Sequence, residues 1–201
     1  FRSDPYPAPL YEITHTARDI KEKYNEQTAD QFKAVSLAGR IMSVRDMGKA
    51  NFAVLQDATG RIQVYLKRDE ICPDEDKTMY DTVWKRLLDI GDIIGVKGYV
   101  FTTKTGETSI HVSSFTLLTK SLHPLPIVKE KDGEQFDAVT DLEFKYRQRY
   151  ADLIVNPGVK ETFLKRTRLM NAIRDFLNER GALEVDTPVL QSIPGGAAAR
   201  P

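Results

Sequence analysis

Residues 51–66 read NFAVLQDATGRIQVYL, and this stretch decides the fold. Apolar residues alternate with polar or aromatic residues on both sides of the short turn Ala58-Thr59-Gly60, which is typical of two half-buried strands. In the second run the two faces separate most clearly, as Ile62, Val64 and Leu66 against Arg61, Gln63 and Tyr65.

The flanking sequence extends this pair into a larger all-β unit. A strand that begins at Val35 and turns at Gly48 precedes it, because Gly48 can adopt the positive φ of a tight turn. Apolar residues at helical spacing follow between positions 79 and 88, and two strand-like runs cover 93–103 and 109–118. Three strands, a helix and two strands within about 90 residues are the element order of an OB-fold barrel.

Four parts are expected along the chain. They are an N-terminal extension with a helix (1–33), the five-stranded OB-fold β-barrel with its helix between strands 3 and 4 (34–120), a linker (121–140) and the start of an α/β domain (141–201).

Helix signals occur on both sides of the barrel. Thr16 followed by Asp19 predicts the capped start of a helix over 16–28. Asp141 predicts the cap of a short helix through position 151.

Asn156-Pro157 predicts the start of a long helix that Gly181 ends. A strand over 183–185, broken by Pro188, is expected next.

Composition excludes several classes of protein. With 41% hydrophobic and 29% charged residues, the 201-residue chain can bury a core, and it has no apolar run long enough for a membrane helix. A formal net charge of zero argues against a wholly basic, sequence-blind nucleic-acid binder. The single cysteine, Cys72, fits a reducing compartment and an unreactive core or loop thiol.

No catalytic or metal site can be assembled from the residues alone. His15, His111 and His123 lack metal-ligand spacing, and Gly195-Gly196 lacks the Lys and Ser or Thr of a phosphate-binding loop. No metal ligand is therefore expected.

The outward face of the predicted barrel carries the best candidate binding groups. Strand alternation turns Phe52, Gln63, Arg40 and Arg61 outward. A ring can stack on an unpaired base, an amide can read a base edge, and guanidinium groups can meet phosphate. An outward Phe can equally be covered by a loop or mark a protein interface, so both readings stay open. Similarly, residues 145–150 (KYRQRY) can touch RNA backbone or form a helix whose arginines bind carboxylates.

Several stretches resemble a known family. Residues 38–42, 47–52, 55–57 and 60–63 resemble the anticodon-binding barrel of the aspartate, asparagine and lysine subgroup of class II aminoacyl-tRNA synthetases. Residues 146–153 resemble the segment that leads into the catalytic domain of bacterial-type lysyl-tRNA synthetases, 176–188 resemble class II motif 1, and 194–201 resemble the lysine-enzyme signature.

The resemblance implies roles for the outward residues. Phe52 matches a ring that stacks on an anticodon base, Gln63 the amide that reads the central uridine, and Arg40 a base- or backbone-contacting arginine. Glu107, in the predicted hairpin, matches an acid that helps to read lysine anticodons. Motif 1 implies a dimer interface that includes Gly181, Pro188 and, in the signature, Arg200.

For the whole protein, the resemblance implies a cytoplasmic, homodimeric lysine–tRNA ligase. Such an enzyme joins lysine to tRNA(Lys) through lysyl-adenylate, with ATP and Mg²⁺. Motifs 2 and 3, which bind ATP, do not occur within these 201 residues, so we expect the chain by itself to bind the anticodon without aminoacylation activity.

Two alternatives from other classes remain at this point. One is a general OB module for single-stranded nucleic acid, which would prefer single-stranded DNA over structured tRNA. The other is a protein-interaction or scaffold role in which residues 157–188 serve only as a dimer surface.

Overall fold

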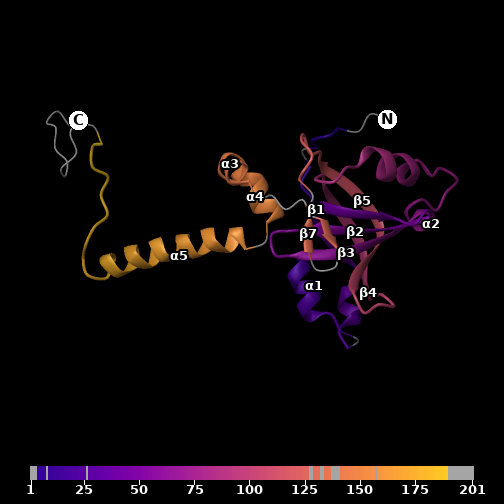
Figure 1. Cartoon of the computed structure of the whole chain (residues 1–201). Helices are drawn as coiled ribbons and strands as arrows, with labels where there is room; N and C mark the ends of the chain where they lie inside the picture. Colours follow the sequence, from indigo (N-terminus) through magenta and orange to yellow (C-terminus); the bar gives the residue numbers. More distant parts are fainter. Residues whose placement is uncertain are drawn as a thin grey trace. The chain divides into compact units, whose positions relative to one another are not determined.

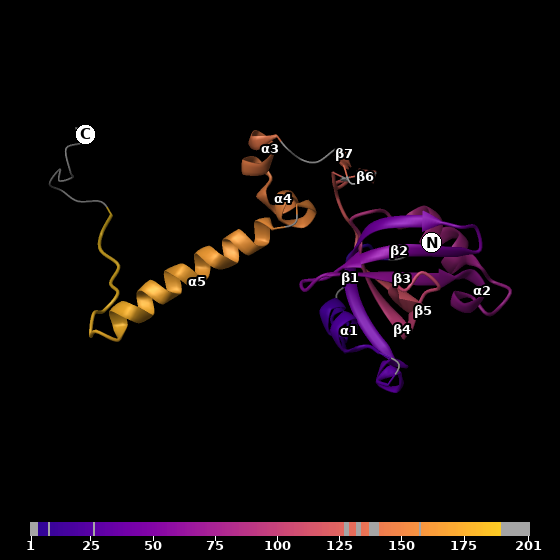
Figure 2. The same ribbon diagram turned by 60° about the horizontal axis from the view of Figure 1, so that its bottom comes forward.

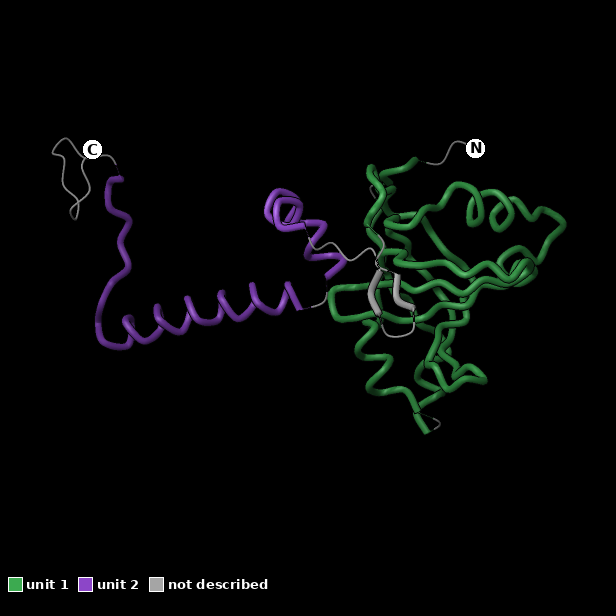
Figure 3. Tube along the Cα trace, in the orientation of Figure 1, with its two compact units in different colours: residues 1–129 green, residues 130–201 purple. Residues whose placement is uncertain are grey.

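The chain divides into two compact units. The computed structural model describes residues 4–7, 9–25, 27–126, 129–131, 134–136, 141–156 and 158–189. Unit 1 spans residues 1–129 and unit 2 residues 130–201 (Figure 3). The division falls inside the expected linker, where β6 (Lys129–Lys131) and β7 (Glu134–Phe136) pair as a two-stranded sheet.

Unit 1 is built on a five-stranded closed barrel, which confirms the predicted OB-fold (Figures 1 and 2). The order around the barrel is β1-β2-β3-β5-β4. All neighbours are antiparallel except β3 and β5, which pair in parallel and close the barrel. The strands are β1 (Val35–Asp46), β2 (Ala50–Gln56), β3 (Arg61–Lys67), β4 (Ile93–Thr102) and β5 (Thr108–Thr119).

Alternation along the strands separates the core from the outer surface. On β3, Ile62, Val64 and Leu66 are 1% exposed or less, whereas the intervening residues keep part of their surface in solvent. Full burial of an aliphatic side chain of this size stabilises the fold by about 1.5–3 kcal/mol. The two faces therefore match those expected from the sequence.

The contact between β4 and β5 depends on a glycine. The pairing register shifts between Lys97 and Gly98, and a Cβ at Gly98 would lie 1.9 Å from the carbonyl oxygen of His111. Any larger residue at position 98 would push the two strands apart. Gly106, with a φ of 84°, makes the hairpin that joins the same strands, as predicted.

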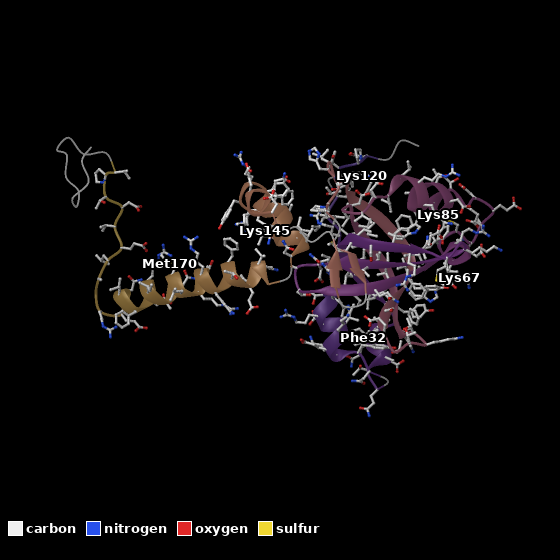
Figure 4. The ribbon with its side chains drawn as sticks, viewed as in Figure 1. Phe32, Lys67, Lys85, Lys120, Lys145 and Met170 are labelled. Atoms are coloured by element: carbon white, nitrogen blue, oxygen red, sulfur yellow. The ribbon has the colours of Figure 1, made fainter. Side chains whose placement is uncertain are left out.

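Short helices add side chains to the barrel core. At one end lie α1 (Ala17–Lys23) and η1 (Ala29–Phe32), which bury Ile20 and Phe32 (Phe32 is labelled in Figure 4). At the other end, η2 (Met79–Leu87) buries Tyr80 and Trp84. A one-turn helix, α2 (Arg68–Ile71), follows β3.

The helix expected over 16–28 is shorter in the structure. Thr16 and Asp19 form the predicted capping box, but α1 ends at Lys23 because Tyr24 adopts an extended backbone. The Asn25 side chain then accepts hydrogen bonds from the backbone N–H groups of Gln27 and Thr28, which makes a local turn in place of further helix.

The β2–β3 turn holds the start of α1. Asp57 accepts a hydrogen bond from the backbone N–H of Ala17 at 2.7 Å, and its other oxygen accepts from the backbone N–H groups of Thr59 and Gly60. Burial alone would raise the pKa of the Asp57 carboxyl, but these hydrogen bonds outweigh it and hold the pKa below the ordinary 3.8. The carboxylate thus joins the N-terminal helix to the barrel.

A buried amide holds η2 to the barrel. With its oxygen turned toward the helix, the Asn51 side chain accepts from Trp84 Nε1 at 2.7 Å and from the Tyr80 hydroxyl at 3.2 Å. Burial raises the pKa of that hydroxyl to about 12, so Tyr80 stays a neutral donor. The helix ends at Leu87, and Gly91 takes a φ of 105° in the turn that enters β4.

The described residues of unit 2 form three helices, α3 (Leu142–Arg147), α4 (Arg149–Val155) and α5 (Val159–Asn178). Asp141 caps α3 as predicted, by accepting from the backbone N–H groups of Glu143 and Phe144. The single helix expected through position 151 is wrong, because Gln148 leaves the helical conformation and divides it in two. None of the helices within the described ranges is long and apolar enough to span a bilayer.

The ends of α5 correct one prediction and confirm another. Asn156 does not cap this helix, because its amide donates to Asp152 Oδ1 at 2.6 Å at the end of α4 and Gly158 precedes α5 with a φ of 86°. Pro157 lies outside the described residues. Gly181 ends the helix as predicted: its N–H bonds to the Asn178 carbonyl and that of Ala182 to the Leu177 carbonyl.

The strand expected over 183–185 is absent from the described part of unit 2, where this segment is extended but has no neighbouring strand to pair with. Arg174 instead ties it to α5, because its Nε donates to both carboxylate oxygens of Glu184 at 3.0 and 2.9 Å.

The Asp57 carboxylate gives a test of the barrel. Asp57→Asn replaces an accepting oxygen with an NH₂ group, so the Ala17 N–H or the turn loses its partner. We expect a loss of about 1–2 kcal/mol in the free energy of unfolding at pH 7, measured by urea denaturation. Because the pKa of the Asp57 carboxyl is lower in the folded state, its charged form stabilises the fold at pH values above 3.8. This stabilisation disappears as the pH falls through the pKa of the folded state.

The difference between wild type and Asp57→Asn should therefore shrink between pH 5 and pH 3. Asp74→Asn, in an exposed loop, is the matched control and should change little. A difference that is equal at both pH values would show that the charge of Asp57 contributes nothing.

Candidate nucleic-acid interface

The predicted binding residues lie on the outer surface of β1, β2, β3 and the β4–β5 hairpin. Pairing places Arg40 opposite Gln56, and Gln56 opposite Arg61, in one row across three strands. Glu107 stands at the start of the hairpin's second arm, just before the strand that pairs with β3. The barrel thus brings to one face residues that are up to 67 positions apart in sequence, from Arg40 to Glu107.

Phe52 stands in the middle of β2 and is half-buried. Its backbone pairs with Arg45 of β1 and Tyr65 of β3. The Tyr65 ring lies 4.9 Å from the Phe52 ring, centroid to centroid, with a tilt of 44°. A ring supported from one side and partly open on the other can stack on a planar ligand.

Gln63 of β3 lies between Val54 of β2 and Ser109 of β5. Its Nε2 donates to the Ser109 hydroxyl at 3.2 Å, and Ser109 is fully buried. That hydroxyl donates in turn to the Glu107 carbonyl at 3.3 Å. One amide N–H is therefore used to orient the group, and no hydrogen bond to Gln63 Oε1 is found among the described residues.

The oriented amide keeps one donor and one acceptor for a ligand. Uracil presents an N3–H donor beside a carbonyl acceptor on its pairing edge, so the two patterns are complementary. Cytosine presents the reverse pattern at these atoms, with an N3 acceptor beside an amino donor.

The charged residues of the face already have partners within unit 1. Arg40 Nη1 donates to the Gly91 carbonyl at 2.7 Å, and Arg61 Nε donates to Gln56 Oε1 at 2.7 Å. Lys21 Nζ lies 3.1 Å from Glu107 Oε1, and both side chains are about half exposed. An exposed pair of this kind holds its partners weakly, so Glu107 remains accessible to a competing donor.

Further aromatic residues extend the face beyond the residues that the sequence singled out. Tyr65 pairs with His111 of β5, and His111 pairs with Tyr99 of β4, so these rings continue the row that begins at Phe52. The Tyr65 and His111 rings are 5.0 Å apart, and those of His111 and Tyr99 are 4.8 Å apart. Phe101 lies in the next row, opposite Ser109.

Polar groups hold the far end of this ring row in place. His111 bonds the Tyr99 hydroxyl through Nδ1, and its Nε2 lies 2.6 Å from a carboxylate oxygen of Glu70 in α2. Lys67 donates to the same carboxylate at 2.9 Å. Burial, with the charge of Glu70, raises the pKa of the Tyr99 hydroxyl, so it stays neutral.

Unit 2 has its own candidate residues. In the stretch 145–150, Arg147 pairs with Glu143 at 2.8 Å and Arg149 pairs with Asp152, as the alternative of carboxylate-binding arginines predicts. Tyr146 and Tyr150 nevertheless remain 74% and 63% exposed within this unit.

Of the residues expected at the dimer interface, Gly181 and Pro188 follow α5 in an exposed segment, and Arg200 lies outside the described residues. The α5 helix also leaves large apolar side chains exposed (Met170 is labelled in Figure 4), namely Phe163, Leu164, Leu169, Met170, Ile173, Phe176 and Leu177.

Metal-binding groups do not gather anywhere in the described ranges. Among those residues, no cluster of three or more His, Cys, Asp or Glu side chains lies close enough to hold an ion. The described residues therefore provide no ligand set for the Mg²⁺ that is expected for the whole enzyme.

Comparison with known proteins finds a separate family match in each of the two compact units. Residues 35–118 match the OB-fold nucleic acid binding domain, and residues 141–201 match the class II tRNA synthetases of the D, K and N group. The chain is 61% identical over 98% of its length to proteins named lysine–tRNA ligase from Porphyromonas gingivalis and Azobacteroides pseudotrichonymphae, and 57% identical to one from Christiangramia forsetii. It spans 34%, 39% and 34% of their respective lengths, about a third.

Residues 35–118 thus resemble an OB-fold nucleic acid binding domain, and residues 141–201 resemble class II tRNA synthetases. Nearly the whole chain is similar to about a third of proteins that are named lysine–tRNA ligase.

Proposed function

We propose that unit 1 binds the anticodon loop of tRNA(Lys) and that the whole protein joins lysine to this tRNA, through lysyl-adenylate. The observation that carries the proposal is the oriented amide of Gln63 beside the half-buried ring of Phe52, on the outer face of an OB-fold domain. The names of the curated relatives support the ligase half of the proposal.

Each group has a role that suits an unpaired uridine. Phe52 stacks on a base, Gln63 Oε1 accepts from uracil N3–H, and the remaining Nε2–H donates to the adjacent carbonyl oxygen. Glu107 can accept from the N3–H of another uracil if Lys21 releases it. Arg40 and Arg61 contribute positive charge near the bound strand.

The same proposal covers the remaining properties of the whole protein. It uses ATP, with Mg²⁺, and it works in the cytoplasm, where the single buried thiol, Cys72, would stay reduced. It forms a homodimer through the region of Gly181, Pro188 and Arg200.

Gln63 gives the test of anticodon reading. Gln63→Leu removes both hydrogen-bonding groups with little change in size. We expect wild type to prefer an RNA hairpin with a UUU anticodon over one with UCU by about 1–3 kcal/mol, and the variant to lose that preference. Equilibrium binding of the full chain to the two hairpins measures it.

Gln27→Leu, outside the face, is the matched control and should keep the preference. Equal wild-type affinity for both hairpins, or tighter binding to single-stranded DNA of the same sequence, would contradict the anticodon proposal and favour a general single-strand module.

Aminoacylation assays test the proposal that the whole protein joins lysine to tRNA(Lys). The full-length protein should charge tRNA(Lys) with lysine when given ATP and Mg²⁺, and should not charge it with aspartate or asparagine, the other amino acids of the matched group. Charging with either of these, or none with lysine, would contradict the assignment.

The exposed apolar side chains of α5 allow a test of the proposed homodimer. Ile173→Glu places a charge among them, and we expect sedimentation of the full-length protein to shift from dimer to monomer because burying that charge is unfavourable. Asn171→Glu, roughly on the opposite side of the helix, should leave the dimer intact. A wild-type monomer at micromolar concentration would reject the dimer.

A further inference from the structure

The ring of Phe101 has no role in the proposed reading of one base by Phe52 and Gln63. Phe101 stands on the outer surface of β4, since its neighbour Val100 is 6% exposed and turned into the core. It pairs with Ser109 of β5, the residue that also pairs with Gln63. Phe101 and Gln63 therefore lie in one row with a single strand between them.

The surroundings of Phe101 leave it half-buried. Its ring is 6.1 Å from the Tyr65 ring, 5.7 Å from His111 and 6.5 Å from Tyr99. Tyr65 is thus flanked by Phe52 on one side and Phe101 on the other. Packing beneath and beside the Phe101 ring limits its movement, while part of its surface remains open.

The Phe52 and Phe101 rings form two separate stacking positions. The strand order β2-β3-β5-β4 puts Phe52 and Phe101 on strands that are not neighbours, and the Tyr65 ring lies between their rings, 4.9 Å from Phe52 and 6.1 Å from Phe101. One base cannot stack on both rings, since stacked rings lie within a few ångströms of each other. Gln63 lies between them, where a single strand of nucleic acid that crosses both rings would pass.

We propose that Phe101 stacks on a second unpaired base, next in sequence to the base that Gln63 reads. The face then takes two consecutive bases, one on Phe52 with its edge on Gln63, and its neighbour on Phe101. This inference rests on the proposed binding of the anticodon loop. The exposed Lys104 in the adjoining hairpin can meet the phosphate that follows the second base.

The test measures coupling between protein rings and RNA bases. The full chain is titrated with a UUU-anticodon hairpin and with hairpins that lack the first, the middle or the third anticodon base. Phe101→Leu should weaken binding of the intact hairpin about 5- to 100-fold. For one of the two hairpins that lack a flanking base (the first or the third), Phe101→Leu should have little further effect on affinity, because the base that stacks on Phe101 is already missing. Phe52→Leu should couple in the same way to the middle base, and Phe101→Tyr, which keeps a ring, should bind as wild type does.

Several outcomes overturn the inference while anticodon binding stands. One is an unchanged affinity of Phe101→Leu when Phe52→Leu binds weakly. Another is a loss of equal size on all four hairpins, which would show that Phe101 only supports the sheet. If Phe101→Leu does not fold, the wild-type titration decides, because unchanged binding when either flanking base is removed would also overturn it. Failure of every hairpin to bind would reject the anticodon proposal and this inference together.

Discussion

The parallel pairing of β3 with β5 closes the barrel, and most of the structure depends on it. Its register sets Gln63 beside Ser109, Val64 beside Ile110 and Tyr65 beside His111. A shift of one residue would turn the buried aliphatic side chains outward and the outer face inward. The same pairing therefore fixes the hydrophobic core, the orientation of the Gln63 amide and the row of rings. No short turn enforces it, because 41 residues separate Leu66 from Thr108.

Contacts at the margins hold this closure in place. Gly98 lets β4 approach the His111 carbonyl, which allows the side chains of Tyr99 and His111 to meet. His111 in turn reaches Glu70 in the helix that follows β3. At the other end, Asp57 joins the β2–β3 turn to α1, and Lys21 of α1 reaches Glu107. Groups far from the candidate site in sequence thus set the positions of its rings and of its hairpin.

The sequence predicted those parts of the fold that local patterns determine. Period-two alternation distinguishes the inward from the outward residues of the first three strands, and this is sufficient to assign Phe52, Gln63 and Arg40 to the outer face. It could not identify Phe101 or His111 as neighbours of that face, because their positions depend on a pairing between distant strands. The same limit explains the strand wrongly expected over 183–185, since an extended segment becomes a strand only beside a partner.

Local signals also failed where two caps competed. Asn156-Pro157 has the composition of a helix start, but the amide of Asn156 bonds to Asp152 and ends the preceding helix, so α5 begins after Gly158. Sequence alone cannot say whether an Asn serves the helix before it or the one after it.

Charge has a limited part in the proposed recognition. The chain has no net charge, and the arginines of the face already donate to a backbone carbonyl and to a glutamine. Attraction to phosphate is strong only where many cations are available, and it does not distinguish one base from another. Stacking on rings and hydrogen bonds to base edges must then supply most of the proposed binding to the anticodon loop. The groups suited to these contacts are held in place by neighbouring side chains of the barrel. Gln63 is fixed by a buried hydroxyl, and Phe52 and Phe101 are braced against Tyr65. Because these groups would lose little conformational freedom on binding, the proposed face can discriminate between bases without a large excess of positive charge.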